Sequence, residues 1–219
     1  MESKASHGEE VNCMKSLFPM FVKLDGRKVL VVGAGQVGEP KIRGLLSTGA
    51  RIHVVAHNTS AAVREWARSG EMVLEERGFV LSDLDNVFLV VVATSSRDLN
   101  EFVFGEARAR GILCNVVDVP EQCDFYYPAV VQRGDLQIAI STSGQSPSLA
   151  QRIRQQLERQ FGPGYAHWVA ELGETRRKVL ASDLDPERKR FLLQSLASVE
   201  AFEAALVADS NANKRGAAV

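Results

Sequence analysis

The feature that most constrains the fold is a glycine-rich loop between a short apolar run and a helical stretch. Residues 29–38, VLVVGAGQVG, place the pattern G-x-G-x-x-G directly after this run. Gly33 permits a tight turn, Gly35 lets the backbone approach a pyrophosphate, and Gly38 allows the helix to pack closely on the strand. The N–H groups at the helix start then face an anion. Glycines also serve plain turns, but in a strand–turn–helix setting the loop favours dinucleotide binding.

Strand and helix patterns alternate through the first half of the chain. Apolar, β-rich runs predict strands at 27–32, 51–56, 72–75, 87–93 and 112–117, and the stretches between them predict helices at about 38–47, 59–69 and 97–110. The run at 87–93 is unbroken, as expected for a strand covered on both faces. This alternation predicts an α/β fold with a Rossmann-like doubly wound parallel sheet, in the strand order 3-2-1-4-5.

The pattern changes after Asp118. Two short strands are predicted about a turn at residues 133–135, and in the second strand Leu136, Ile138 and Ile140 share one face. These strands have no obvious partners in the parallel sheet, and an uncovered apolar face is normally buried by another subunit. The sequence therefore predicts a dimerisation region here.

The rest of the chain is predicted to be helical. Ser146 and Pro147 start a helix that ends near Gln160, because they supply a capping hydroxyl and a proline in the first turn. Asp185-Pro186 starts a later helix in the same way. The predicted organisation is a disordered leader (1–16), an NAD-binding Rossmann domain (17–118), a dimerisation region (119–146), a helical domain (147–208) and a disordered tail (209–219).

Composition excludes several classes of protein. The net charge of −1 provides no global basic field, so we expect no nucleic acid and no membrane as a partner. The longest apolar run is far too short to cross a bilayer. Three cysteines form no closely spaced pair, which favours a reducing cytoplasm over a disulfide framework. His53 and His57 do not have helical metal-ligand spacing, and no metal ligand is predicted.

The expected cofactor is NAD. The acid that binds the adenosine ribose normally lies about 20 residues after the loop, where this chain has Ala56, His57 and Asn58. We therefore expect His57, Asn58 or backbone groups to contact the ribose. No cation stands there for a 2′-phosphate, so NAD should be preferred modestly over NADP. The predicted cofactor-binding residues are Gly33, Ala34, Gly35, Gln36, Val37, Gly38, His57, Asn58, Thr94 and Ser95.

A lone acid, Asp118, stands at the tip of the fifth predicted strand. In the expected strand order, the strand ends at Gly33, at Thr94 and Ser95, and at Asp118 are neighbours. A cofactor on the glycine loop would extend past Thr94 toward Asp118, which could take a proton while hydride leaves the substrate. Alternatively, Asp118 caps a turn before Pro120. Position alone leaves both roles open.

Two segments carry a resemblance to a known family: LFPMFVKLDGRKVLVVGAGQVGEPKIRGLLSTGARIHVVA and GILCNVVDVPEQCDFYYPAVVQRGDLQIAISTSGQSPSLAQRIRQQLE. Their order and spacing resemble the N-terminal module of siroheme synthase, the precorrin-2 dehydrogenase/sirohydrochlorin ferrochelatase family, in its stand-alone form. The resemblance covers about residues 17–160. It implies oxidation of precorrin-2 to sirohydrochlorin with NAD, insertion of ferrous iron in many members, and an intertwined homodimer.

The resemblance also implies roles for particular residues. The last residue of N-V-V-D is the catalytic aspartate of the family and corresponds to Asp118, and the family's serine falls on Thr142. Ser143 and Gly144 correspond to a glycine pair of which only Gly144 is kept, and Ser95 replaces an aspartate. Precorrin-2 is a flat polycarboxylate macrocycle, so aromatic walls and scattered cations suit it. The predicted substrate-binding residues are Thr142, Ser143, Gly144, Arg133, Arg152 and Tyr126.

Two other functions use the same loop. A regulatory module would bind NAD without chemistry, but such modules usually carry the missing ribose acid and need no N-V-V-D. A conventional small-substrate dehydrogenase would need a tyrosine–lysine or histidine–aspartate pair, which we do not find in suitable context.

Overall fold

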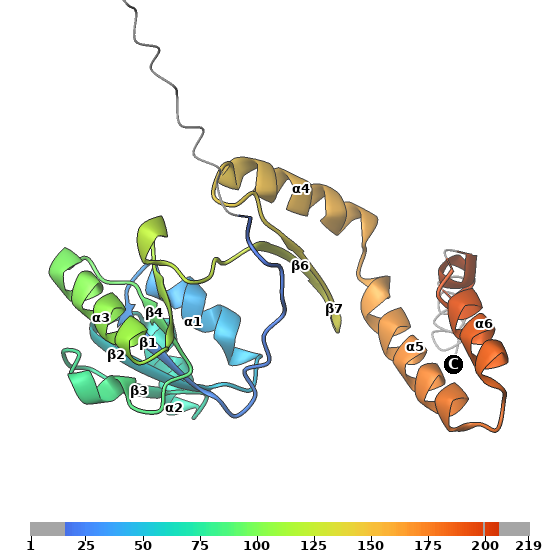
Figure 1. The fold of residues 1–219 in the computed structure, drawn as a ribbon, viewed down its shortest axis with the longest axis horizontal. Helices are drawn as coiled ribbons and strands as arrows, with labels where there is room; N and C mark the ends of the chain where they lie inside the picture. Colours follow the sequence, from blue (N-terminus) through green and yellow to red (C-terminus); the bar gives the residue numbers. More distant parts are fainter. Residues whose placement is uncertain (1–15, 199, 206–219) are drawn as a thin grey trace, which may run out of the picture. The chain divides into compact units, whose positions relative to one another are not determined.

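The computed structural model describes residues 16–198 and 200–205. The chain forms two compact units (Figure 1). The first unit ends at Tyr127, and the second begins at Pro128. The predicted tail, and the predicted leader apart from Ser16, lie outside the described residues. The finer partition into a dimerisation region and a helical domain stays a prediction.

The first unit is built around a five-stranded parallel sheet in the order β3-β2-β1-β4-β5, which confirms the predicted topology. Its strands are β1 (Lys28–Ala34), β2 (Arg51–Thr59), β3 (Val73–Glu75), β4 (Leu89–Val92) and β5 (Leu113–Val116). Its helices are α1 (Gly38–Leu46), α2 (Ala61–Arg68) and α3 (Arg97–Ala109), with the 3₁₀ turns η1 (Leu81–Leu84) and η2 (Pro120–Gln122). All carboxyl ends of the strands lie at one edge, where ligands of this fold bind.

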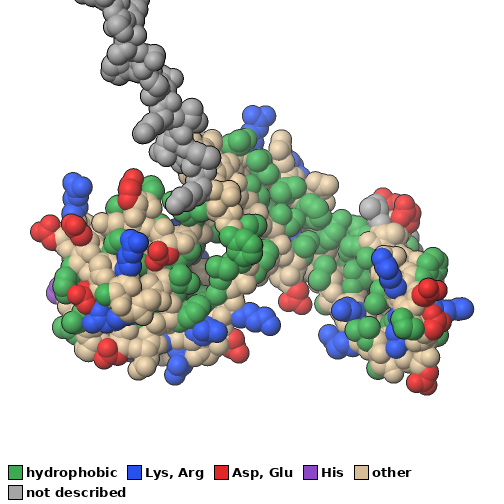
Figure 2. Space-filling model, in the orientation of Figure 1, with side chains coloured by type: hydrophobic (Ala, Val, Ile, Leu, Met, Phe, Trp, Pro, Cys, Tyr) green, Lys and Arg blue, Asp and Glu red, His purple; other side chains and the backbone are tan. Residues whose placement is uncertain are grey.

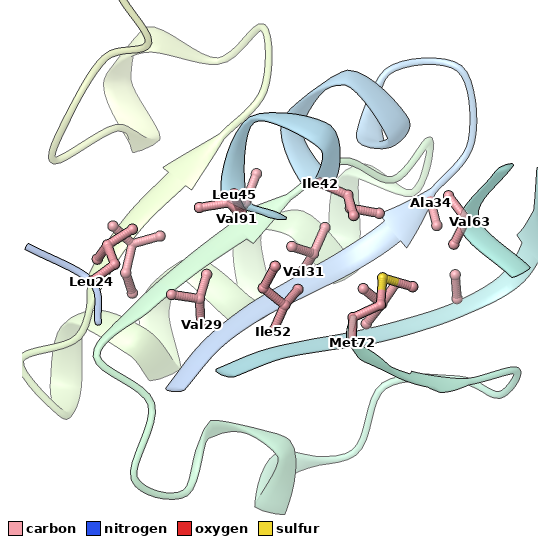
Figure 3. Close-up of a cluster of buried hydrophobic side chains, with 13 residues drawn as sticks. Leu24, Val29, Val31, Ala34, Ile42, Leu45, Ile52, Val63, Met72 and Val91 are labelled. Carbon is pink, nitrogen blue, oxygen red and sulfur yellow. The ribbon is translucent and has the colours of Figure 1, made fainter. Parts of the chain in front are cut away.

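Two hydrophobic clusters cover the two faces of this sheet. Successive residues of a strand point to opposite sides, so each central strand feeds both clusters. On one face, Ile42 and Leu45 of α1 and Val63 of α2 pack on Val31 and its neighbours (Figure 3). On the other face, α3 and η1 contribute the side chains that cover the sheet, including Val103. Helices on both faces make the fold doubly wound, as predicted.

The largest difference from the predicted boundaries is at β2. This strand continues to Thr59, three residues beyond its predicted end, because Thr59 pairs with Ala34 after a register shift in β1. Helix α2 consequently starts at Ala61, and the Ser60 hydroxyl caps it by accepting a hydrogen bond from the Val63 N–H at 3.2 Å. The polar end of β2 is thereby held beside the glycine loop.

The second unit contains a hairpin and helices. The antiparallel strands β6 (Ala129–Arg133) and β7 (Leu136–Ile140) form the predicted hairpin, and α4 (Pro147–Gln160), α5 (Gly164–Ala181) and α6 (Pro186–Leu196) follow. Ser146 and Asp185 cap α4 and α6 with proline in the first turn, as predicted. Figure 2 shows hydrophobic side chains gathered over α4 and the hairpin on one face.

The predicted apolar face of the hairpin is half-buried within its own chain. Leu136 and Ile138 pair across the strands with Arg133 and Val131, so these four side chains share one face. Val131 is fully buried, and Arg133 donates to backbone carbonyls at the end of α4. Helix α4 therefore covers this face, whereas Val130, on the opposite face, is 39% exposed. No helix among residues 16–198 and 200–205 is long and apolar enough to cross a membrane.

Candidate functional site

The glycine loop leaves space for a ligand at one position and none at the other two. Gly33 has a φ of +94°, and a Cβ placed there would lie 2.3 Å from the Ala93 carbonyl oxygen. A Cβ on Gly38 would lie 2.3 Å from the Gly33 carbonyl oxygen, so α1 packs directly on the loop. A Cβ on Gly35 would meet nothing within 4 Å. The backbone at Gly35 thus faces open space at the start of α1, which fits a pyrophosphate.

The end of β4 forms the next part of this edge. Thr94 lies against the loop, since its methyl group would be 3.2 Å from a Cβ on Gly33. Its hydroxyl donates a hydrogen bond to the Asn100 side-chain oxygen at 2.5 Å, and the Asn100 amide donates to the Thr94 carbonyl at 3.2 Å. Ser96 then caps α3 by accepting from the Leu99 N–H at 3.3 Å. Thr94 is fixed beside the loop, while Ser95 is exposed.

The end of β2 carries the residues predicted for the adenosine ribose. His57 and Asn58 are both exposed at this end. The His57 ring lies against the segment after β3, because its Nε2 would be 3.2 Å from a Cβ on Gly78. Thr59 follows and pairs with Ala34 of the loop. The predicted residues are therefore beside the glycine loop and accessible to a ligand.

Asp118 follows β5 in a turn at the same edge. Val92 pairs with Val116, so Thr94 and Asp118, each two residues further on, follow neighbouring strand ends. Asp118 has a φ of +64°, in the left-handed region that aspartate tolerates better than most residues. The turn is closed by the Val119 N–H, which donates to the Val116 carbonyl at 3.2 Å. The exposed Asp118 carboxylate makes no hydrogen bond within the described part of the chain.

A second residue of N-V-V-D, Asn115, holds the aromatic segment against β5. Its side-chain amide donates to the Phe125 carbonyl at 2.7 Å and to the Cys123 sulfur at 3.3 Å. Asp124 adds a carboxylate that accepts from the Cys114 N–H at 3.0 Å. Phe125 and Tyr127 then pack with ring centres 5.8 Å apart. Asn115 thus fixes the aromatic residues that follow Asp118, a role that its place within a buried strand did not reveal.

Lys41 of α1 provides a cation near Asp118. Its Nζ lies 4.0 Å from the centre of the Tyr127 ring, a favourable cation–π geometry. Burial lowers the pKa of Lys41, and the negative charge of Asp118 acts against that shift. A half-buried ammonium group beside a carboxylate can also attract an anionic ligand. Sequence reasoning missed Lys41, because its partners come from segments about 80 residues away.

The predicted substrate-binding loop lies before α4 in the second unit. Ser143 and Gly144 both have positive φ values, +52° and +79°, so the backbone turns sharply there. The Thr142 hydroxyl accepts a hydrogen bond from the Ser146 N–H at 3.1 Å, and the Ser143 N–H donates to the Ser141 hydroxyl at 3.1 Å. The loop is thereby shaped at the N-terminus of a helix, where backbone N–H groups favour anions.

Three further predicted substrate residues differ in their surroundings. Arg133 donates to the carbonyls of Phe161 (2.9 Å), Glu158 (3.2 Å) and Gln132 (2.8 Å), so its guanidinium satisfies the end of α4. Arg152 is exposed on α4, and Tyr126 is 37% exposed. Exposure leaves Arg152 and Tyr126 accessible to a ligand. Within residues 16–198 and 200–205, no group of three His, Cys, Asp or Glu could hold a metal ion.

Comparisons with known proteins agree with this geometry. Residues 20–129 match the family model described as "Putative NAD(P)-binding", and residues 133–160 match "Sirohaem biosynthesis protein central". The solved structure of "SirC, precorrin-2 dehydrogenase" is similar with a TM-score of 0.74 and 33% identity, covering 85% of this chain and 92% of that chain. The chain belongs to the precorrin-2 dehydrogenase family. Its first unit is the NAD(P)-binding domain of that family.

Longer relatives carry the same region. Siroheme synthase 1 of Serratia proteamaculans is 38% identical over 175 residues, which cover 79% of this chain and 37% of that protein. The siroheme synthase of Ectopseudomonas mendocina is 40% identical over 173 residues, which cover 78% and 37%. The chain therefore spans little more than a third of the length of these curated relatives. The family membership confirms the resemblance carried by the glycine loop, N-V-V-D and the segment before α4.

Proposed function

We propose that this protein oxidises precorrin-2 to sirohydrochlorin with NAD, as a step of siroheme biosynthesis. The observation that carries the proposal is the Asp118 carboxylate, which follows β5 without a hydrogen-bond partner in the described residues. It stands one strand away from Thr94, which touches the glycine loop. The likeness to SirC, of which the chain covers 92%, supports the same activity.

Different residues of the first unit would bind the cofactor and accept the proton. The loop from Gly33 to Gly38 would hold the pyrophosphate, and His57 and Asn58 would contact the adenosine end. Bound NAD would supply the hydride acceptor. Asp118 would take the proton that the substrate loses at the same time, acting as a positioned general base. Because Asp118 is exposed, a large substrate that extends beyond the end of β5 can contact its carboxylate.

The substrate would bind through side chains that suit a polycarboxylate macrocycle. Tyr126 offers an aromatic surface, and Arg152 offers an exposed cation that can pair with carboxylates. The loop at Thr142, Ser143 and Gly144 adds backbone donors at a helix start. Arg133 belongs to the same predicted set, although its contacts are those of a helix C-cap, so it would contribute through its remaining N–H groups.

Several finer features belong to the same proposal. NAD should bind more tightly than NADP, because residues 54–59 at the end of β2 include no lysine or arginine for a 2′-phosphate. Ferrous iron would be a second substrate if sirohydrochlorin is converted to siroheme on the same chain, and Asp118 would then also accept protons from the macrocycle. We propose a homodimer in the cytoplasm, in keeping with the cysteine content.

Replacement of Asp118 separates this function from an NAD-binding regulatory role. Asp118→Asn keeps the size of the side chain but cannot accept the proton, so precorrin-2 oxidation should fall by about 10²- to 10⁴-fold. Binding of NAD should survive, because the pyrophosphate rests on the glycine loop. Anaerobic single-turnover absorbance and calorimetry with NAD measure the two quantities on one preparation.

The opposite pattern would contradict the proposed role of Asp118. A variant that oxidises precorrin-2 at the original rate would leave Asp118 as a turn residue. If it also melts at lower temperature, by a loss of about 0.5–2 kcal/mol, the carboxylate acts as a cap. Wild-type protein that binds NAD but never oxidises precorrin-2 would favour the regulatory module.

A further inference from the structure

The end of β3 places a carboxylate beside the glycine loop. Thr59, the last residue of β2, pairs directly with Ala34 of the loop. The Thr59 hydroxyl donates a hydrogen bond to Oε1 of Glu76 at 2.7 Å. Glu76 directly follows β3, which runs parallel to β2. The carboxylate is therefore one side chain away from the loop, at the edge where all the strands end.

A cation holds the same carboxylate from α2. The Arg64 Nε donates to Oε1 of Glu76 at 3.0 Å. The hydrogen bonds from Thr59 and Arg64, in that order, lower the pKa of Glu76, so the group is a carboxylate at neutral pH. Both bonds end on Oε1, and Oε2 has no partner among the residues that the structure describes. Since 46% of the Glu76 side chain is exposed, a ligand can reach it.

We propose that Glu76 supplies, from β3, the acid for the adenosine ribose that this chain lacks after β2. In other dinucleotide-binding sheets that acid accepts hydrogen bonds from the ribose hydroxyls and repels a 2′-phosphate. Asn58 occupies its usual position here. Glu76 would therefore be the residue that sets the preference for NAD over NADP. This inference rests on the dinucleotide binding of the proposed function.

The pairing of Glu76 differs from that of an ordinary surface ion pair. Arg68 and Glu65 lie on the same helix, three residues apart, and form a contact of 2.8 Å with both side chains more than 65% exposed. That pair involves only α2. The Glu76 pair instead links α2, the end of β2 and the end of β3. Arg64 has a second role here: without the carboxylate, its guanidinium would lose this partner and could pair with a 2′-phosphate instead.

Calorimetric titration of the full chain with NAD and with NADP tests the inference without any enzymatic turnover. Glu76→Gln should weaken NAD binding by about ten- to a hundredfold, the range expected for a hydrogen bond to a charged group. NADP binding should stay constant or become tighter, so the ratio of the two affinities should fall by at least as much. Glu65→Gln, on the matched pair, should leave both affinities unchanged.

Two further results complete the test. Thr59→Val keeps the carboxylate but removes the hydrogen bond that orients it, so it should reduce the preference for NAD less than Glu76→Gln does. If Glu76→Gln does not fold, Thr59→Val takes its place in the test. A folded Glu76→Gln protein with the wild-type ratio of affinities would overturn the inference while leaving the proposed function intact. Wild-type protein that binds neither dinucleotide would overturn the proposed function as well.

Discussion

At the scale of single residues, Lys41 combines a charge with a half-buried position. Its pKa is lowered by burial, so between this lowered pKa and the ordinary value of 10.5 the unfolded chain binds more protons than the folded protein. Stability must then rise with pH as Lys41 deprotonates. The ring of Tyr127 and the charge of Asp118 compensate only in part.

Lys41→Met should remove this pH dependence. At neutral pH the variant should be at least as stable as the wild type, because a half-buried charge is replaced by an apolar side chain. The difference should shrink as the pH rises toward 10.5, where the wild type also loses the charge. Melting curves of both proteins between about pH 7 and 10 measure it. A difference that stays constant over that range would show that the pKa of Lys41 is not lowered in the folded protein.

At the scale of elements, the glycine loop allows a matched pair of substitutions. Gly33→Ala should destabilise the fold by at least about 1–2 kcal/mol, because its φ of +94° disfavours a side chain and its Cβ would meet the Ala93 carbonyl. Gly35→Ala should keep or slightly raise stability, since its Cβ meets nothing within 4 Å and alanine restricts the unfolded chain.

Gly35→Ala, the substitution that should leave stability intact, should nevertheless weaken cofactor binding. Gly35→Ala places a methyl group where the pyrophosphate would approach, so NAD affinity should fall by about tenfold or more in a protein of normal stability. Calorimetry and melting curves together separate affinity from folding. Unchanged NAD affinity in Gly35→Ala would place the pyrophosphate away from this loop.

Sequence patterns predicted the elements because each follows from local chemistry. The unbroken apolar run that became β4 and the caps at Ser146 and Asp185 need no knowledge of distant residues. The extension of β2 to Thr59 was missed because it depends on pairing with Ala34, 25 positions earlier. Glu76 and Lys41 were missed for the same reason, since each gains its partners only when separate segments pack together.

At the scale of the whole molecule, the hairpin of the second unit is the basis for predicting a dimer. Helix α4 covers the face that carries Val131, but a two-stranded sheet with an exposed Val130 on its other face is marginal by itself. A second copy of the chain, joined through residues from about 119 to 150, would cover it. Light scattering at micromolar concentration should give twice the mass of one chain. A monomer would count strongly against this assembly.

The most direct test of the whole account is the conversion of precorrin-2 by the purified chain alone. Under anaerobic conditions with excess NAD, we expect the absorption of precorrin-2 to be replaced by that of sirohydrochlorin. One molecule of NADH should form for each molecule of precorrin-2 consumed, because the reaction transfers one hydride. Wild-type protein that is folded and binds NAD, yet forms neither NADH nor sirohydrochlorin, would contradict the account.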